Sequence, residues 1–215
     1  LADLPDNIAR PRYELAALQP GIVHLGIGAF MRAHLAVATE AAMHSSDDLR
    51  WGIVGVSLRH ADTRDALVPQ DGLYTLAVRD ADTAGQPRQE LQVLGCVRRV
   101  LVASEEPAAV LAAIAAPSTH IVSLTITEKG YVSTPGSAVD FIVQGLAERH
   151  ARGEAPVTLM SLDNLAANGK RLKQLVADLA GERDPALAQW IETSCSFPNS
   201  MVDRIVPRTS DADRA

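Results

Sequence analysis

Short apolar runs alternate with longer stretches of helix-forming residues along most of this chain. The apolar runs have the length and composition of buried strands, and they occupy residues 21–25, 51–56, 120–126 and 156–160. The longer stretches carry proline only at their start, and they predict helices over residues 29–44, 107–116, 138–152, 168–180 and 185–193. Strands separated by helices indicate parallel pairing through right-handed crossovers. The pattern therefore predicts an α/β fold with a doubly wound, mostly parallel sheet and helices on both faces.

Residues 72–102 depart from this alternation. Residues 74–79 and 90–94 each alternate apolar and polar side chains, and Ala84-Gly85 lies between them as a turn. We therefore predict a hairpin, a small antiparallel insertion in the parallel fold. The first 20 residues are irregular and rich in proline, so we expect an N-terminal arm over residues 1–20 followed by one domain over residues 21–215.

Composition narrows the class of protein. The chain has 215 residues, of which 47% are hydrophobic and 21% charged, and its net charge is −6. A negative chain lacks the basic surface that nucleic acids require, so we expect no nucleic-acid partner. No apolar run approaches the roughly 20 residues of a membrane span, and no signal peptide opens the chain, so we expect no membrane segment. Cys96 and Cys195 stand alone, which fits a reducing cytoplasm.

Two other kinds of site find little support. The six histidines form no ligand-like cluster, so we expect no metal site, and His24 is expected to be a core histidine satisfied by hydrogen bonds. No GxSxG motif or Cys–His arrangement favours a hydrolase.

The turn after the first predicted strand contains Gly26 and Gly28. A dinucleotide-binding Rossmann fold places its pyrophosphate at this turn, because glycines allow close backbone approach and the following helix offers free amides. The usual third glycine is replaced by Met31, and a plain tight turn is the alternative. The expected cofactor-binding residues here are Gly26, Gly28, Ala29, Phe30 and Arg32.

The end of the second predicted strand is where such folds read the adenosine ribose. The usual acidic residue is displaced: Ser57 stands there, and Arg59 and Asp62 follow. Arg59 could face a 2′-phosphate and favour NADP, or be a solvated loop residue. NAD remains the preferred cofactor, with NADP not excluded.

The segment 197–207 places the charged pair Asp203-Arg204 between apolar residues, with a proline near each end. Such a pair is costly to bury unless each charge meets a partner or a ligand. A segment of this kind near the chain end suggests one side of a larger site.

Four blocks spread over the chain carry a resemblance to a known family. They are residues 21–34 (GIVHLGIGAFMRAH), 51–59 (WGIVGVSLR), 121–131 with 161–164 (IVSLTITEKGY and SLDN), and 197–207 (FPNSMVDRIVP). In this order they closely resemble the mannitol dehydrogenase family of long-chain polyol and hexuronate dehydrogenases, which includes fructuronate reductase-like proteins. The resemblance implies an NAD-dependent oxidoreductase that interconverts a secondary alcohol of a polyol or sugar acid and its ketone.

The resemblance also implies roles for individual residues. Asn164 would be one of two amides that polarise the substrate oxygen, and Asp203 would face the substrate or the cofactor. Glu128 would pass protons between a catalytic lysine and solvent, and Asp62 would help to hold the adenosine ribose. From residue types alone, Asn164 could instead be a turn residue or the cap of the next helix. Asp203 could form an ion pair with Arg204, and Glu128 could be a solvated loop residue.

The chain departs from the family pattern in three places. Met31 replaces a usual histidine, and the segment between Tyr131 and Phe141 is short. The family also continues into a helical domain that carries the catalytic lysine in a Lys-x4-Asn-x2-His motif, which these residues lack. We therefore expect this chain to be the cofactor-binding half, inactive alone, with its own C-terminal domain as a partner. The face that such a domain would cover could also drive self-association.

Several substrates and two other functions stay open. The resemblance admits mannitol/fructose, arabinitol/xylulose and mannonate/fructuronate pairs, and the wording of residues 127–131 leans towards the hexuronate branch. A non-catalytic nucleotide-binding module is the main alternative. A methyltransferase that holds S-adenosylmethionine at its glycine loop is a more distant one.

Overall fold

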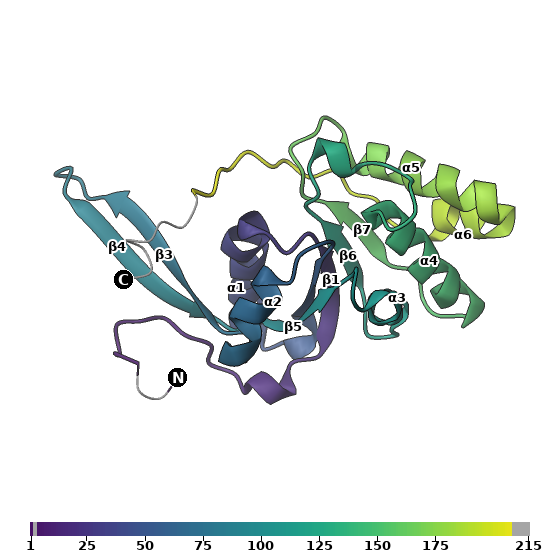
Figure 1. The fold of residues 1–215 in the computed structure, drawn as a ribbon. Coiled ribbons are helices and arrows are strands. Elements are labelled where there is room, and N and C mark those ends of the chain that lie inside the picture. Colours follow the sequence, from purple (N-terminus) through teal and green to yellow (C-terminus); the bar gives the residue numbers. More distant parts are fainter. Residues whose placement is uncertain (2–3, 208–215) are drawn as a thin grey trace.

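The computed structural model describes residue 1 and residues 4–207 (Figure 1). Its centre is a five-stranded sheet in the order β5-β2-β1-β6-β7, in which every neighbouring pair is parallel. The strands are β1 (Pro20–Leu25), β2 (Gly52–Ser57), β5 (Val97–Val102), β6 (Ile121–Leu124) and β7 (Thr158–Ser161). From β1 the chain adds β2 and β5 on one side, and it then returns to the other side of β1 to add β6 and β7. This order is that of a Rossmann-type fold, as predicted.

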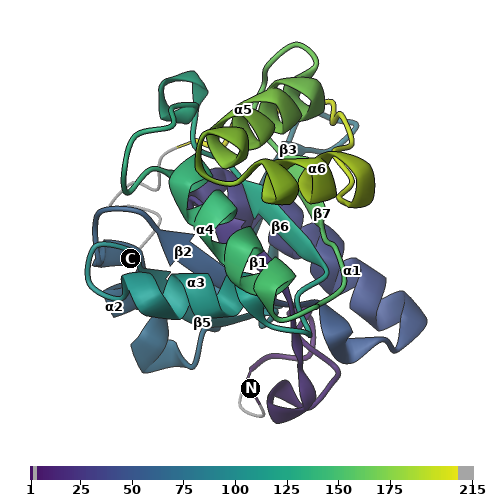
Figure 2. The same cartoon turned by 90° about the vertical axis from the view of Figure 1, so that its right-hand side faces the viewer.

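Helices cover both faces of the sheet (Figures 1 and 2). They are α1 (Ala36–Ser46), α2 (Asp62–Leu67), α3 (Pro107–Ala115), α4 (Ala138–Ala151), α5 (Asn168–Arg183) and α6 (Pro185–Ser194). In the two views α3 and α4 lie across one face, with α5 and α6 stacked beside them, and α1 lies on the opposite face. A π-helical turn, Met31–Leu35, leads into α1. The predicted helices are confirmed, whereas the short α2 was not predicted.

Two separate hydrophobic cores follow from alternation along the strands. Val23 and Leu25 of β1 point to the α3–α4 side, and both are nearly or fully buried there. Ile22 points to the α1 side, where it packs with Met31 and Met43. A strand buried on both faces must be apolar at successive positions, which explains the continuous apolar run that β1 shows in the sequence.

The predicted insertion is present as a two-stranded antiparallel hairpin, β3 (Tyr74–Ala81) with β4 (Pro87–Leu94), which projects away from the body (Figure 1). Residues 72–102 are not all insertion, however. After the hairpin the chain returns and β5 pairs with β2 as an edge strand of the main sheet. This strand was missed because Arg98 and Arg99 interrupt its apolar run. The edge position leaves room for those two side chains at the surface.

The N-terminal arm packs against the base of the hairpin. Ala9 forms a parallel bridge with Gln92 of β4. The Tyr13 hydroxyl donates to the carboxylate of Glu40 at 2.7 Å, and the same buried carboxylate accepts from the amides of Gly95 and Cys96. A buried carboxylate thus joins the arm, α1 and the turn between β4 and β5.

His24 forms a buried polar relay between β1 and β6, as the sequence predicted. The Thr125 hydroxyl donates to the carbonyl of Gly26 at 2.8 Å, so its oxygen accepts from His24 Nε2 at 2.9 Å. The Nδ1 atom then accepts from the Ser123 hydroxyl at 2.8 Å. These directions define the neutral tautomer with its proton on Nε2. The relay connects the interior of the sheet to the turn that follows β1.

We expect His24 to make the protein less stable in acid. Burial lowers the pKa of His24 from 6.5 to about 3. Between those values the unfolded chain binds a proton that the folded chain does not, so the free energy of unfolding falls as pH decreases through this range. The slope owed to one such group approaches about 1.4 kcal/mol per pH unit.

Urea unfolding at a series of pH values tests this expectation. His24→Asn should flatten the acid slope relative to the wild type, and His60→Asn, which changes an exposed histidine, should leave the slope unchanged. A difference between His24→Asn and the wild type that stays constant from neutral pH to pH 4 would contradict the assignment.

Candidate functional site

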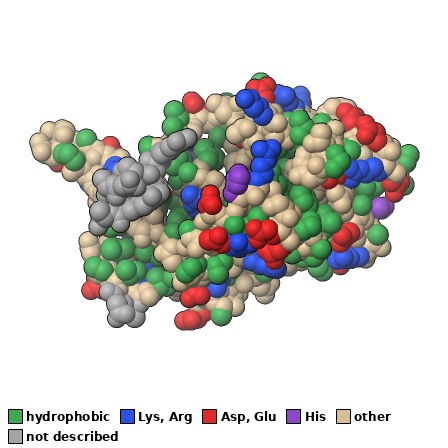
Figure 3. All heavy atoms as spheres, viewed as in Figure 1, with side chains coloured by type: hydrophobic (Ala, Val, Ile, Leu, Met, Phe, Trp, Pro, Cys, Tyr) green, Lys and Arg blue, Asp and Glu red, His purple; other side chains and the backbone are tan. Residues whose placement is uncertain are grey.

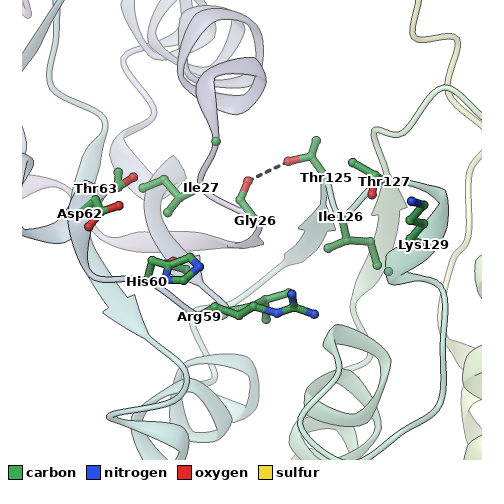
Figure 4. Close-up of a pocket in the computed structure, with 14 residues that line it drawn as sticks. Gly26, Ile27, Arg59, His60, Asp62, Thr63, Thr125, Ile126, Thr127 and Lys129 are labelled. Carbon is green, nitrogen blue, oxygen red and sulfur yellow. Dashed lines mark hydrogen bonds between the residues drawn. The ribbon is translucent and has the colours of Figure 1, made fainter. Parts of the chain in front are cut away.

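A cleft of about 620 Å³ opens at the carboxyl ends of β1, β2 and β6 (Figure 4). It lies where the connections of the sheet diverge, since β1 pairs with β2 on one edge and with β6 on the other. Open α/β sheets bind their ligands at this switch point. The lining residues are Gly26, Ile27, Gly28, Ser57, Leu58, Arg59, His60, Asp62, Thr63, Thr125, Ile126, Thr127, Lys129 and Gly130.

The two glycines of the first turn are glycines for different reasons. Gly26 has φ +99°, and a Cβ on it would collide with the carbonyl oxygen of Thr125. The fold itself therefore requires glycine there. Gly28 has no such restriction, because the nearest atom to an added Cβ would be the Gly26 oxygen at 3.8 Å. The missing side chain at Gly28 keeps the wall of the cleft open.

The other three expected cofactor-binding residues of this turn are not among those that line the cleft. Ala29 is exposed, and the half-buried ring of Phe30 packs on that of His34 with 4.7 Å between ring centroids. The Arg32 guanidinium donates to the carbonyl of Ile27 at 2.9 Å, and burial lowers the pKa of Arg32. Arg32 thus supports the loop through its own backbone.

The β2 side of the cleft carries charges of both signs. Arg59, His60, Asp62 and Thr63 lie there, and Asp62 is the first residue of α2 (Figure 4). Asp62 and Arg59 are both exposed. In Figure 4 the Arg59 side chain extends away from Asp62 towards Ile126, so the carboxylate and the guanidinium meet different parts of the cleft. Over the wider face in Figure 3 acidic and basic side chains are likewise interspersed.

The β6 side is held by one buried carboxylate that the sequence analysis did not single out. Asp163 accepts from the amide of Ile126 at 3.1 Å, from the amide of Thr127 at 2.9 Å and from the Tyr131 hydroxyl at 3.0 Å. Between these contacts lies the short 3₁₀ turn Glu128–Gly130. Glu128 is exposed and pairs with Arg171 at 3.6 Å, while Lys129 lines the cleft. The position of Asp163 in the sequence could have indicated its role. It closely follows the buried strand β7, and side chains that follow neighbouring parallel strands meet at the same edge of the sheet.

Asn164 is exposed, directly after Asp163. The alternative in which it caps the following helix is wrong, because α5 begins only at Asn168 and follows Ala167. Instead the Asn199 side chain accepts from the amides of Gly169 and Lys170 at 3.0 and 3.2 Å. Asn199 belongs to the closing segment, so a distant part of the chain covers this helix end and the Asn164 side chain is not used for it.

The closing segment is fixed at its start and exposed further on. The Ser200 hydroxyl donates to the carbonyl of Ser161 at 2.6 Å, which ties the segment to the end of β7. Beyond it Met201 and Ile205 are 93% and 92% exposed. Asp203 and Arg204 are exposed as well. Both charges therefore stay in contact with solvent, and neither carries the free-energy cost of burial.

The same segment passes close to the first helix. Burial and the charge of Arg204 together lower the pKa of His34, which lies in the π-helical turn before α1. The trace of the segment runs from α6 towards that helix (Figure 1). Glu128 and Asn164 follow the neighbouring strands β6 and β7. Asp203 forms no hydrogen bond or ion pair with either of them among residues 4–207.

The described residues hold neither a metal-binding cluster nor a membrane-spanning helix. They contain no group of three or more His, Cys, Asp or Glu side chains arranged to hold a metal ion. None of the helices in the described part of the chain has the length and apolarity to cross a membrane. Cys96 and Cys195 are both buried free thiols.

Comparison with known proteins identifies the family. A family model for the mannitol dehydrogenase Rossmann domain matches residues 20–215. Mannitol 2-dehydrogenase of Phaeosphaeria nodorum is 38% identical, over 97% of this chain and 40% of that protein. Polyol:NADP oxidoreductase of Gluconobacter oxydans is 36% identical, over 98% of this chain and 47% of that protein.

A solved structure agrees with these sequence relatives. Pseudomonas fluorescens mannitol 2-dehydrogenase, in a ternary complex with NAD and D-mannitol, is similar with a TM-score of 0.91 and 37% identity, over 100% of this chain and 48% of that one. This chain therefore spans less than half the length of these relatives. With its switch-point cleft, its glycine turn and a family match over residues 20–215, the chain belongs to the mannitol dehydrogenase family.

Proposed function

We propose that these residues form the NAD(H)-binding half of a dehydrogenase that interconverts a secondary alcohol of a polyol or sugar acid and its ketone. The proposal rests on the open space beside Gly28. The fold does not need glycine at this position, so its open space is best explained by a ligand whose backbone approach a side chain would block. NAD in the ternary complex of the Pseudomonas fluorescens relative supports the choice of ligand.

The cleft supports one direction for the bound cofactor. Its pyrophosphate would lie over Gly26 and Gly28, near the amides that begin the first helix. Its adenosine ribose would meet Asp62 on the β2 side, and its nicotinamide would lie towards Thr127 on the β6 side. Asp62 favours NAD, because a carboxylate accepts from a ribose hydroxyl and repels a 2′-phosphate. Arg59 keeps NADP as the competing cofactor.

Hydride transfer further needs a base and donors for the substrate oxygen. We assign Asn164 to that oxygen, Glu128 to proton exchange with solvent, and Asp203 to the substrate or cofactor side. The base is assigned to a second half like the one that the relatives' greater length provides. That half would cover the exposed Met201 and Ile205, and without it the same surface favours self-association. Residues 127–131 lean slightly towards the hexuronate branch, and mannitol/fructose and arabinitol/xylulose are the other candidate pairs. The cytoplasm is our proposed location.

Calorimetric titration with NADH tests the central claim. We expect the wild-type chain to bind NADH and Gly28→Ala to bind it about 10- to 100-fold more weakly, since an added methyl group overpacks the wall of the site. Gly181→Ala is a matched control, because an added Cβ there also has its nearest contact at 3.8 Å, away from the cleft. Absence of NADH and NADPH binding by the wild type, or equal affinity in Gly28→Ala, contradicts the proposal. Binding of S-adenosylmethionine instead would favour a methyltransferase.

The choice between the two cofactors is tested at Asp62. Asp62→Ala should weaken NADH binding about ten-fold or more, as expected for loss of a hydrogen bond to a charged group, and should weaken NADPH binding less. Asp65→Ala is the control, because Asp65 lies in the same helix but pairs with Arg64 and does not line the cleft. An unchanged ratio of the NADH and NADPH affinities in Asp62→Ala would remove the ribose role.

The division of the site between two halves has its own test. These 215 residues should bind NADH yet catalyse no NAD reduction with mannitol, arabinitol or mannonate, because no assigned residue is a base for the alcohol. Turnover followed by NADH absorbance is the measurement. Activity of the pure chain on any of these substrates would disprove the placement of the base, while leaving cofactor binding intact.

A further inference from the structure

Thr127 adopts a backbone conformation that its side chain disfavours. Its φ of 62° and ψ of 166° lie in a region that is essentially restricted to glycine, and a β-branched residue there is a clear outlier. Thr127 lines the cleft directly after β6. Strained residues of this kind persist only where surrounding contacts hold them, and they occur most often at functional sites.

The contacts that hold Thr127 come from Asp163. Oδ1 of this carboxylate accepts from the Thr127 amide at 2.9 Å, and Oδ2 accepts from the preceding amide of Ile126 at 3.1 Å. Asp163 is only 8% exposed, so these bonds form where water competes little. The carboxylate thus stabilises two successive amides in the geometry that the strained turn requires.

The same carboxylate also closes the other end of the turn. The Tyr131 hydroxyl donates to Oδ2 of Asp163 at 3.0 Å, and Tyr131 is itself buried. Burial keeps the pKa of Tyr131 above its ordinary value, so the hydroxyl remains a donor at neutral pH. Residues 126–131 are therefore a loop attached at both ends to one side chain. The stretch between carries Lys129 and Gly130, which line the cleft.

We propose that Asp163 is a positioning residue that holds the strained Thr127 turn, and with it the β6 wall of the cofactor cleft. The inference rests on the proposed function, since the ligand whose site this wall borders is NADH. Asp163 itself does not line the cleft, so it acts through the loop that it holds. It also precedes Asn164, so the carboxylate that shapes the loop fixes the start of the segment assigned to the substrate oxygen.

The first test compares two buried carboxylates. Asp163→Asn keeps the shape of the side chain but replaces one acceptor oxygen with an NH₂ group, which cannot accept from the loop. We expect NADH affinity to fall about ten-fold or more, because displacement of binding groups by a fraction of an ångström is costly. Asp140→Asn is the control: Asp140 is 3% exposed, accepts from the Gly136 amide and pairs with Arg183, away from the cleft. It should lower the urea midpoint and leave NADH affinity within about two-fold.

A double-mutant cycle separates positioning from general stability. Thr127→Gly removes the backbone strain, since glycine adopts this conformation freely. Asp163→Asn should therefore lower the urea midpoint less in the Thr127→Gly background than in the wild type, and the double variant should regain part of the NADH affinity lost in Asp163→Asn. Additive effects on both quantities would overturn the proposal, as would wild-type affinity in Asp163→Asn.

The proposal can still be tested if Asp163→Asn fails to fold or if the wild type binds no NADH. If Asp163→Asn does not fold, Tyr131→Phe removes the bond to the carboxylate together with the bond to the Ser161 hydroxyl, and it should give a smaller loss of NADH affinity. Unchanged affinity would count against the proposal. If the wild type binds no NADH, the proposed function fails. The cycle in urea then still decides whether Asp163 holds the strained turn.

Discussion

Strand β1 pairs in parallel with both β2 and β6, and this pairing sets the layout of the whole sheet. A central strand with neighbours on both edges and helices on both faces must be apolar at nearly every position. Because the chain leaves β1 towards one edge and later returns to the other, the two sets of connections diverge above its carboxyl end. The cleft is the space that this divergence leaves, and its position follows from topology before any side chain is considered.

Buried polar contacts then shape the walls of the cleft. On the β1 side, His24 is hydrogen-bonded to the Thr125 hydroxyl, which in turn donates to the carbonyl of Gly26. From the β7 side, Asp163 holds the amides that follow β6. The residues after β6 are thus attached to both neighbouring strands, and each attachment ends in a backbone group that borders the cleft. Such fully satisfied networks are stiff, because an unpaired buried partner would be costly. A wall of this kind suits the recognition of a cofactor through its backbone approach.

Most of the fold could be predicted from local patterns, and the exceptions have physical causes. Strand β5 was missed because an edge strand tolerates Arg98 and Arg99, so its periodicity is weak. The start of α5 at Asn168 was predicted, but its cap was not, because its first amides are covered by Asn199, which lies 30 residues beyond Gly169 in the chain. Asp163 and Asn164 belong to one sequence motif, yet only the exposed Asn164 could be given a role from it, because partners in another loop leave no trace in the spacing of residues. The roles of Asn164, Asp203 and Glu128 remain predictions.

Four of the five parallel strands, the longer helices, the glycine turn after β1 and the family resemblance could all be inferred from the sequence, because short-range periodicity and contiguous motifs reveal them. Only the tertiary structure distinguished Gly26, which the backbone requires, from Gly28, which the fold leaves open. Only the tertiary structure brought Asp163 to Thr127 across neighbouring strands. The reason is that periodicity reports which face of an element is buried, whereas contacts between strand ends depend on how the whole sheet is ordered.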